Sequence, residues 1–391
     1  MRYKTKEVLI GYLFSLPMII IFSLFLVYPI IMAFYYSLTN YQPLEARKFY
    51  RTFNPLEAVE LHTGLSRDEI ISYAAEDIVS LMNPIEFVEL EVGITLTKTE
   101  ENIVEKNLDL LKFIQDLKSG KLPHEMKVSE FFKRYLTSQE GAKKFSKYRP
   151  DFVGLANFKL MLKDPYFLSS FLNTLLYSSI VVPTQTLLAI VLAVAANSRI
   201  RGVILFKIVF FLPAITSSAA QSMIFMLLYS KPGILNKLLT TLFGWAGFQP
   251  IDYLNDPKYA LFAVMIMNIW STAGYFMVTF LAGLQDIPVS LIEAAKIDGA
   301  NNWEIFWKII LPLLRPQIVF VSIMGTIGCM QVFDQIYFLI KSMRNITISY
   351  YIYKNAFEYG KMGYASALAV FLFTVILALS LIQRRLIKET Y

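Results

Sequence analysis

A polar segment, 285–316, stands between two long apolar runs and carries the residue pattern best suited to binding another surface. Pro288 fits the first turn of a helix, and Ser290 fits its N-cap. Four residues that follow share one helical face, at i, i+3, i+4 and i+7 spacing: Leu291, Ala294, Ala295 and Asp298. The two adjacent alanines keep that face small, so another molecule can approach the helix backbone closely.

The same segment predicts a second helix after a sharp turn. Gly299 takes positive φ readily and therefore fits the end of the first helix. The second helix begins at about Asn302 and is broken by Pro312 and Pro316. Its large apolar residues are Trp303, Phe306, Trp307 and Ile310. The resulting helix-turn-helix either docks another protein or anchors the chain in the lipid headgroup region through its two tryptophans.

The chain lacks the residue patterns of common enzyme sites. It has no HExxH zinc motif, no GxSxG nucleophile elbow and no GxxxxGK[ST] phosphate loop. The tripeptide SGK at 119–121 lacks the upstream glycine of such a loop. Both histidines, His62 and His124, lie in a polar insertion away from the apolar runs. We therefore expect no catalytic residue, no metal site and no ATP hydrolysis in this chain.

The composition is that of a membrane protein. Of the 391 residues, 55% are hydrophobic and 17% are charged, against about 25% charged residues in soluble domains. Six runs contain no Asp, Glu, Lys or Arg, and each is close to the roughly 20 residues that a membrane-crossing helix needs: 8–44, 165–198, 208–230, 259–285, 316–333 and 362–383. We expect an all-α membrane protein with six transmembrane helices, the third unbroken over 203–229 and the fifth continuing to Ile340.

Basic residues near the ends of these runs predict the orientation of the chain, because loops rich in Lys and Arg stay in the cytoplasm. They are Arg2, Lys4, Lys6, Arg199, Arg201, Lys207, Lys296, Lys308, Arg315, Arg384, Arg385 and Lys388. Both termini and the segment 285–316 are therefore expected in the cytoplasm. This distribution explains the net charge of +7 without a nucleic-acid partner. The single cysteine, Cys329, lies in the fifth run, so no disulfide can form within the chain.

The chain divides into residues 1–39 with the first helix, an insertion at 40–150, and a membrane core at 151–391. The insertion is polar, lies outside the cell membrane in this topology, and is long enough for a small core of its own. Ser66 and Glu69 form a capping box. The insertion is expected to contain a helix with Ile70, Ala74, Ile78 and Met82 on one face that stops at Pro84, a strand in 85–96, a helix from Thr99 to about Lys118 that Gly120 ends, and a helix at 129–136.

Polar side chains inside the apolar runs mark a candidate solute path, because such groups are costly in hydrocarbon unless they face a cavity or another helix. They are Asn173, Gln185, Gln221, Asn268, Gln331 and Asp334. Hydrogen bonding between helices is the alternative, and it is favoured for Asn173 near the membrane edge. Trp270, Tyr275 and Phe333 add flat faces that suit a sugar, although aromatic rings also serve ordinary packing. The lack of a ring of charges argues against an anionic solute.

The sequence EAAKIDGA, followed by FWKIILPLLRP, resembles the EAA motif of binding-protein-dependent ABC importer permeases. Four further stretches resemble the sugar branch of that family, which includes the first membrane subunit of the maltose transporter: FVGLANFKLMLKDPYFLSSFLNTLLYS, LFKIVFFLPAITSSAA, QVFDQIYFLI and YIYKNAFEYGKMGYASALA. The resemblance covers about 1–40 and 150–391 and leaves the insertion unmatched. It implies a permease subunit that imports a carbohydrate, in particular an oligosaccharide.

The resemblance also implies that the first helix of 285–316 docks on a separate ATPase subunit. Glu293 would be the charged contact, Gly299 the turn, and Asp298 would hold the loop or cap the helix. Seven residues are implied in this coupling: Leu291, Glu293, Ala294, Ala295, Asp298, Gly299 and Ala300. Three aromatic residues would seat the segment against the membrane helices: Trp303, Phe306 and Trp307.

Several partners follow from the resemblance. Two ATPase subunits would hold ATP and Mg²⁺, so the chain itself needs no cofactor. A second, different permease would complete the pathway in the cell membrane of a bacterium or archaeon, and an external solute-binding protein would deliver the sugar. The insertion 40–150 either docks that binding protein or forms a passive cap.

The chain departs from the family after the fifth run, where IKSMRNITIS at 340–349 replaces the usual Gly-Gly-Pro turn, so the family's geometry there does not carry over. Two other transport functions compete. A secondary transporter would show inverted repeats, broken helices or paired ionisable residues at mid-membrane, and Asp334 is the one candidate acid. An ABC importer of amino acids, phosphate or peptides is disfavoured by the FVGLANF and QVFDQIYFLI stretches.

Overall fold

The computed structural model describes residues 2–43, 51–94, 96, 98–138, 141, 145, 150–198 and 202–386, without the side chains of residues 2–11, 99 and 386. Arg199, Arg201 and Lys388 of the orientation pattern lie outside the described residues, as do the side chains of Arg2, Lys4, Lys6 and Thr99. The chain forms two compact units. Unit 1 consists of Met1–Ser37, Leu155–Glu358 and Tyr364–Tyr391, and unit 2 of Leu38–Gly154 and Tyr359–Gly363.

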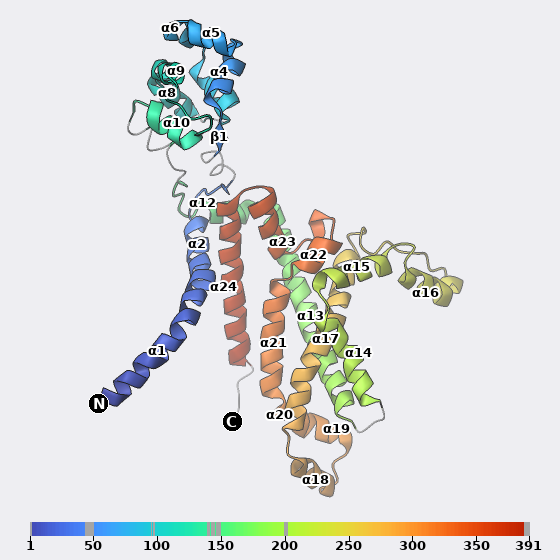
Figure 1. Cartoon of the computed structure of the whole chain (residues 1–391). Helices are drawn as coiled ribbons and strands as arrows, with labels where there is room; N and C mark the ends of the chain where they lie inside the picture. Colours follow the sequence, from blue (N-terminus) through green and yellow to red (C-terminus); the bar gives the residue numbers. More distant parts are fainter. Residues whose placement is uncertain are drawn as a thin grey trace. The chain divides into compact units, whose positions relative to one another are not determined.

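In the described residues of unit 1, helices are the only regular secondary structure (Figure 1). Its α-helices are α1 (Arg2–Phe22), α2 (Tyr28–Ser37), α12 (Ala156–Lys163), α13 (Pro165–Asn197), α14 (Val203–Ile215), α15 (Ser218–Tyr229), α16 (Ile234–Phe243), α17 (Ala260–Gln285), α18 (Val289–Ile297), α19 (Asn302–Ile305), α20 (Leu311–Leu313), α21 (Arg315–Met330), α22 (Asp334–Leu339), α23 (Ile348–Tyr353) and α24 (Met362–Leu386). Short segments of π-helix or 3-10 helix join several of them. The π-helical segments are η1 (Ser23–Val27), η4 (Phe306–Ile310) and η6 (Lys354–Glu358), and the 3-10 segments are η3 (Gly244–Ala246) and η5 (Met343–Asn345).

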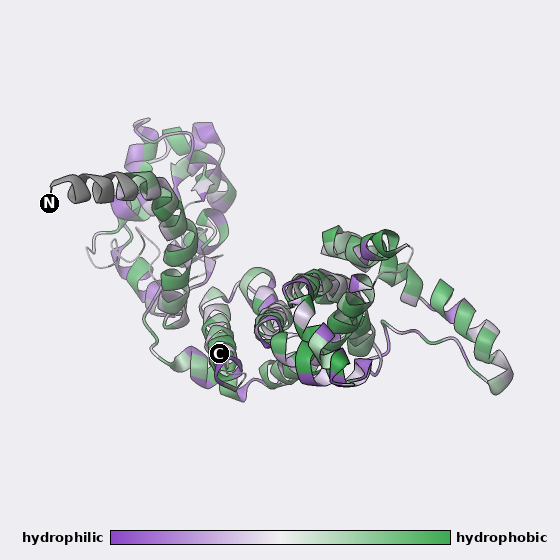
Figure 2. Cartoon of the chain, turned by 90° about the horizontal axis from the view of Figure 1, so that it is seen from below, coloured by the Kyte–Doolittle hydropathy of each residue, from purple (hydrophilic) through white to green (hydrophobic). Residues whose placement is uncertain are grey.

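The expected all-α membrane fold is confirmed. Four helices are long and apolar enough to cross a membrane: Tyr12–Ser37, Pro165–Asn197, Ala260–Gln285 and Met362–Arg385. Two bent helix pairs raise the number to as many as six: Val203–Ile215 with Ser218–Ala246, and Asn302–Leu313 with Arg315–Met330. Hydrophobic residues cover much of these helices (Figure 2, green).

The expectation of an unbroken helix over 203–229 is wrong. The chain bends by 103° between α14 and the helical stretch Ser218–Ala246, which begins with α15. Gln221 stabilises the break, because its side-chain amide donates to the backbone carbonyls of Pro213 and Thr216, the second at 3.0 Å. In hydrocarbon, a helix can break only where its freed backbone groups find other partners. A hydropathy value averaged over a window does not detect one side chain that takes the place of backbone hydrogen-bond partners.

The fifth predicted helix, 316–340, is also broken. A short non-helical stretch separates α21 from α22. The freed carbonyls accept hydrogen bonds from a later part of the chain: Thr347 donates to Val332 at 2.9 Å, and Ser349 donates to Met330 at 3.4 Å. Two hydroxyl groups distant in sequence therefore permit a bend inside an apolar run.

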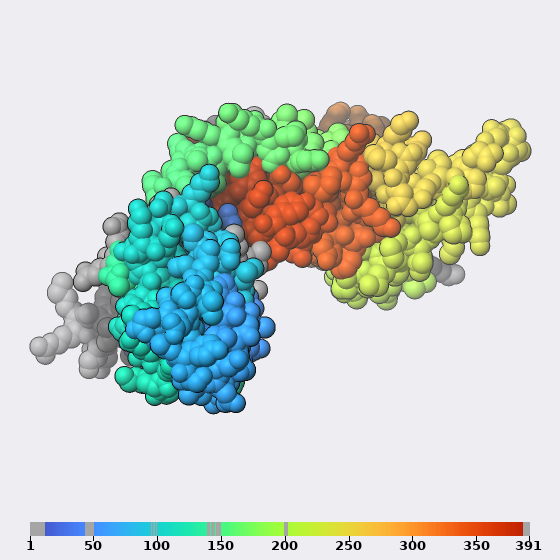
Figure 3. Space-filling view, turned by 90° about the horizontal axis from the view of Figure 1, so that it is seen from above, coloured from blue at the N-terminus to red at the C-terminus, as the bar shows by residue number. Residues whose placement is uncertain are grey.

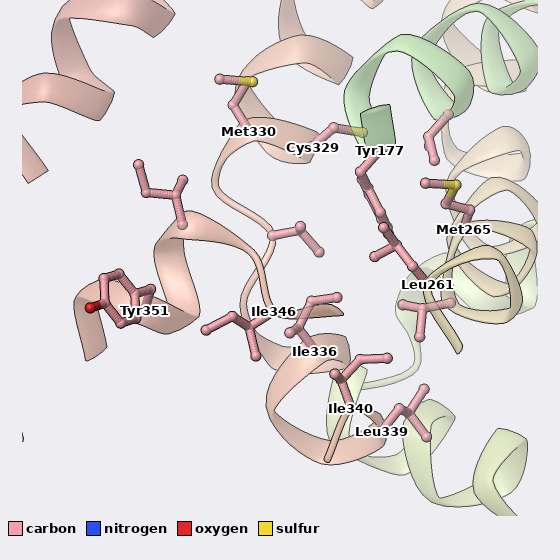
Figure 4. Packing of buried hydrophobic residues seen from close by; sticks show 14 of the residues in the cluster. Tyr177, Leu261, Met265, Cys329, Met330, Ile336, Leu339, Ile340, Ile346 and Tyr351 are labelled. Carbon is pink, nitrogen blue, oxygen red and sulfur yellow. The ribbon is translucent and has the colours of Figure 1, made fainter. Parts of the chain in front are cut away.

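The core of unit 1 lies where α13, α17, α21 and α22 meet. Tyr177, Met265, Cys329 and Ile336 are each at most 3% exposed and point into this region (Figure 4). At the N-terminal end of α13, the Asp164 carboxylate caps the helix and accepts hydrogen bonds from the hydroxyls of Tyr351 and Tyr364, both at 2.6 Å. The helices around the candidate solute path are thus fixed by side chains from several distant segments.

Gly274 on α17 allows the backbone of α14 to approach α17 closely. A Cβ atom at Gly274 would lie 1.7 Å from the carbonyl oxygen of Phe210 on α14. Gly274→Ala is therefore expected to separate the two helices and to lower stability by about 1–3 kcal/mol, the usual range for overpacking. The melting temperature of the purified protein in detergent measures this effect.

The matched control is Gly244→Ala. Its Cβ would lie 3.6 Å from the nearest side-chain atom, at a backbone φ of −59° that every residue adopts. It should leave the melting temperature unchanged. An unchanged melting temperature for Gly274→Ala would contradict the close approach of α14 and α17.

Unit 2 is also mainly helical. Its elements are β1 (Thr52–Phe53), α4 (Pro55–Thr63), α5 (Arg67–Ser72), α6 (Ala75–Ser80), α7 (Pro84–Glu86), η2 (Phe87–Val92), α8 (Lys98–Asn107), α9 (Leu110–Lys118), β2 (Met126–Lys127) and α10 (Val128–Tyr135). The strands pair antiparallel, with Phe53 opposite Met126. Rings of Phe87, Phe113 and Phe131 lie 5.1–6.2 Å apart in a core that belongs to this unit alone.

Some local predictions for this unit are confirmed. Ser66 and Glu69 form the capping box, and the backbone N–H and the hydroxyl of Ser66 lower the pKa of Glu69 by donating to its carboxylate. Helix α10 matches the helix expected at 129–136, and Gly120 follows α9 at φ +69°.

Other predictions for this unit are wrong. The helix expected before Pro84 is split into α5 and α6 because Tyr73 and Ala74 are extended, and Ala74 is exposed. Helices α8 and α9 are separate because Asp109 caps the second one. The strand expected in 85–96 is instead α7 followed by η2. Asn83 caps this helix and Pro84 begins it, a start signal that outweighs the β-branched residues.

Candidate functional site

The segment 285–316 forms the expected helix-turn-helix, with α18 at the opposite end of unit 1 from α22 and α23 (Figure 1). Pro288 is the N-cap of α18, so the expectation that Ser290 caps it is wrong. Proline fits there because the first N–H groups of a helix need no intrahelical acceptor. The helix has no fully buried residue, and Ile292 packs partly against the core, so most of its surface is open in this chain.

The turn after α18 is built on Gly299, which has φ +84°. The N–H of Ala300 donates to the carbonyl of Ala295 at 2.9 Å, and the N–H of Gly299 donates to the carbonyl of Lys296 at 3.1 Å. These two bonds form a Schellman motif, which a glycine at positive φ permits. A Cβ atom at Gly299 would meet no atom within 4 Å. The backbone angle therefore requires glycine here, and steric crowding within the chain does not.

The coupling residues implied by the EAA resemblance lie together around this turn. Five of those on α18 or the turn are exposed, Ala295 is partly buried, and Ala300 follows directly after the turn. Larger apolar side chains lie beside them in the open: Val289 is 66% exposed, Leu291 45% and Ile297 86%. An apolar surface of this kind around small residues marks an interaction site.

The second helix of the segment begins at Asn302, as expected. Asn301 and Glu304 form a capping box that the sequence interpretation missed: the N–H of Glu304 donates to the Asn301 side chain at 2.9 Å, and the N–H of Asn301 donates back at 3.1 Å. The spacing of a polar cap and a Glu three residues later was the available signal.

The expectation that Trp303 and Trp307 seat this helix against the membrane helices is wrong. They are 70% and 49% exposed, and their rings lie 5.6 Å apart on the outer side. Ile305, at 3% exposure, and the partly buried Phe306 pack inward instead. Residues four apart share a helical face, so once Ile305 faces the core the two tryptophans must face away together.

A polar cavity of about 320 Å³ lies among α13, α17 and α21, beside the starts of α15 and α22. Its amide and hydroxyl groups come from Gln185, Ser218, Asn268, Thr272, Gln331 and Gln335. Phe276 and Phe333 add aromatic walls, and Gly325 and Gly328 expose the backbone of α21. Of the described lining residues, Asp334 alone is charged. The cavity can hydrogen-bond an uncharged polar molecule and pack against its apolar faces.

Gln185 is the most deeply buried of the polar groups at this cavity, at 1% exposure. Its Oε1 lies 2.6 Å from the hydroxyl of Thr272, which also lies 2.8 Å from the carbonyl of Asn268. Its Nε2 has no hydrogen-bond partner among the described residues. A Cβ atom at Gly325 would lie 2.4 Å from Nε2, so this glycine provides the space for the amide. The amide of Gln185 therefore has a buried N–H donor without a partner among the described residues, at the wall of the cavity.

Five of the predicted path residues line this cavity: Gln185, Asn268, Gln331, Phe333 and Asp334. Four do not. Gln221 is used at the break before α15 and accepts from Ser271 at 2.8 Å. Trp270 lines a separate apolar hollow, and Tyr275 is 54% exposed. Asn173 donates to backbone carbonyls, as favoured from its position.

Two cavity residues that the sequence interpretation missed share a readable signal. Thr272 and Phe276 follow Asn268 on α17 at spacings of four residues and therefore lie on its side of the helix. Once Asn268 is taken as a path residue, helical periodicity adds Thr272 and Phe276 and removes Trp270. It does not remove Tyr275, which follows Asn268 by seven residues and is 54% exposed in the structure.

Comparison with known proteins bears on the region that holds both the cavity and the segment 285–316. A family model described as "Binding-protein-dependent transport system inner membrane component" matches residues 167–390. The lactose transport system permease protein LacF of Rhizobium radiobacter is 34% identical over 239 residues, which are 59% of this chain and 80% of that protein. The arabinooligosaccharides transport system permease protein AraP of Bacillus subtilis is 35% identical over 246 residues, 60% of this chain and 76% of that protein.

A solved structure agrees in fold. A chain of a bacterial alginate ABC transporter, crystallised with a pentasaccharide-bound periplasmic protein, superposes with a TM-score of 0.56 at 24% identity, covering 61% of this chain and 86% of that one. At this identity the likeness concerns the fold alone. Because the family model matches residues 167–390, more than half of this chain, the chain belongs to the binding-protein-dependent transport system inner membrane components, as a multi-pass permease subunit.

Proposed function

We propose that this chain forms part of the membrane pathway of an ABC importer for a neutral carbohydrate, in particular an oligosaccharide. The cavity carries the proposal, because it combines six amide or hydroxyl side chains with two aromatic walls and a single carboxylate. Sugars need many hydrogen-bonding partners and flat apolar surfaces, and a neutral sugar needs no cation. LacF and AraP are named for lactose and arabinooligosaccharides, which supports the same solute class.

The driving force in this proposal is ATP hydrolysis on two separate ATPase subunits that bind ATP and Mg²⁺. Support comes from α18, whose exposed small face and glycine turn carry the EAA pattern at Leu291–Ala300. Segment 285–316 and both termini would then face the cytoplasm. Unit 2 would lie outside, where it either docks the solute-binding protein or caps the permease.

Two further partners belong to the proposal: a second, different permease subunit, and the external binding protein that gives the family its name. The cell membrane of a bacterium or archaeon is the expected location. Broken helices, expected of a secondary transporter, occur at two places in this fold. Broken helices therefore do not distinguish an ABC importer from a secondary transporter, and the energy source of uptake must be measured.

Uptake by cells that carry or lack this chain tests the proposal. We expect uptake of lactose or of arabinooligosaccharides to require the chain and to stop when cellular ATP is depleted, while collapse of the proton gradient at constant ATP leaves it unchanged. An alginate oligosaccharide should not be taken up, because Asp334 is the one charge at the cavity. Uptake that follows the proton gradient, or a preference for the acidic sugar, would contradict the proposal.

A further inference from the structure

Four aromatic rings gather where α22 meets α23. Phe333 is the residue before α22, Tyr337 lies in its first turn, and Tyr350 and Tyr353 lie on α23. In every pairing, the ring centroids of these four residues are 5.1–6.3 Å apart. We name these four residues the aromatic platform. The sequence interpretation singled out Phe333 alone.

The aromatic platform lies at the surface of unit 1. On α22, Ile336 and Leu339 point into the core at 0% and 2% exposure, while Tyr337 is 42% exposed. On α23, Tyr350 and Tyr353 are partly exposed. The segment that contains both helices forms an open part of the surface (Figure 3, orange). Core packing therefore does not account for three tyrosines here, since packing alone favours apolar rings at the inward positions.

The aromatic platform is continuous with the cavity. Phe333 belongs to both, because it also lines the cavity beside Asp334 and Gln335. A solute in the cavity that is longer than one ring has an aromatic surface directly beside it. The stacked pair Tyr350 and Tyr353, with ring planes 22° apart, extends this surface away from the cavity.

The two charged residues on the segment after Tyr353, Lys354 and Glu358, neutralise each other in an ion pair. Nζ of Lys354 lies 5.5 Å from the ring centre of Tyr350 and 2.5 Å from a carboxylate oxygen of Glu358. The platform thus presents flat apolar faces and phenol hydroxyls without a net charge. These are the properties that bind the apolar face and the hydroxyl groups of a neutral sugar.

We propose that the aromatic platform is a second carbohydrate site, which holds a sugar unit of a chain whose neighbouring unit occupies the cavity. The site rests on the proposed carbohydrate function and adds a length preference to it. An oligosaccharide contacts cavity and platform together, whereas a monosaccharide occupies one of them. Linking two contacts in one molecule strengthens binding without any new group in the cavity.

The experiment compares chain lengths in the complete importer with its binding protein. The variant is Tyr350→Leu with Tyr353→Leu, and the probes are the series arabinose to arabinotriose and glucose to maltotriose. We expect trisaccharide uptake to fall about tenfold, the combined effect of two lost aromatic contacts, with monosaccharide uptake changed less than about twofold. Leucine keeps apolar bulk, and immunoblotting of the membrane fraction establishes that the variant is present.

Two controls separate the site from general packing. Tyr353→Phe keeps the ring and should keep most of the length preference. Phe338→Leu removes a 40% exposed ring of the same helix that lies edge-on to Tyr337, and should leave the preference unchanged. Equal loss at every chain length, or no loss, would overturn the inference while leaving the proposed function intact. Import of neither series by the parent importer would count against the proposed function itself.

Discussion

Gly299→Asp is expected to abolish transport while the protein stays folded in the membrane. Gly299 lies at φ +84° on an exposed turn, and a side chain there meets nothing within 4 Å. An L-residue at this angle costs about 1 kcal/mol, too little to unfold a protein of this size. The new carboxylate instead lies on the face that we propose docks the ATPase subunit. Uptake, membrane abundance and recovery of the ATPase subunit with the purified permease are the measurements.

Gly299→Asn is the matched control for this substitution. Asparagine has the shape of aspartate, tolerates positive φ and carries no charge, so it should retain most of the transport. Equal loss in both variants would assign the effect to the backbone. Full transport in Gly299→Asp would refute docking at this turn.

Glu293→Lys tests the same surface by charge reversal, with Glu293→Gln as its control. Glu293 is exposed on α18, so its substitution leaves the core of unit 1 untouched. We expect the lysine variant to lose transport and to recover less ATPase subunit, and the glutamine variant to keep more of both.

Gln185→Leu is expected to reduce uptake by about 10- to 100-fold without lowering the melting temperature. The substitution removes a buried amide whose Nε2 has no partner among the described residues. Loss of a hydrogen bond from that amide to a sugar oxygen costs about 1–3 kcal/mol in binding. The folded permease loses little, because the Thr272 hydroxyl keeps the carbonyl of Asn268 at 2.8 Å. Initial uptake rates and thermal melting in detergent measure the two quantities separately.

Gln221→Leu provides the opposite result as a control. Like Gln185, Gln221 is a buried glutamine. Its amide, however, donates to the backbone carbonyls at the break before α15 and accepts a hydrogen bond from Ser271. Its loss leaves buried polar groups unsatisfied at about 1–3 kcal/mol each, so the melting temperature should fall. Normal uptake by the Gln185→Leu variant would show that Gln185 does not bind the solute.

The turn of the segment 285–316 could be predicted from sequence because its signals are local. Gly299 and the paired alanines act within one helical turn, and the structure has the helix end and the positive φ at that place. The breaks in the third and fifth apolar runs depend on Gln221, Thr347 and Ser349. Two of these lie outside the run that they bend, so no window along the sequence contains the cause together with its effect.

The solute cavity could be predicted in part. Intramembrane polarity identified Asn268, Gln331 and Asp334 correctly as neighbours of one cavity. It placed Gln221 at the cavity wrongly, because a polar side chain in hydrocarbon can hydrogen-bond the backbone at a helix break as well as a solute. Aromatic residues were least informative: Trp270 and Tyr275 were named for their chemistry, whereas the direction of a ring on an apolar helix depends on packing that composition does not encode.

Cys329 has a practical consequence for spectroscopy and labelling. It is the only thiol of the chain, lines the polar cavity, and is 3% exposed in this conformation. A thiol reagent that modifies this chain must therefore have reached the cavity wall. The labelling rate of the unaltered permease is then a native reporter of how often the cavity opens, and replacing this one residue yields a background into which a single probe can be introduced anywhere else.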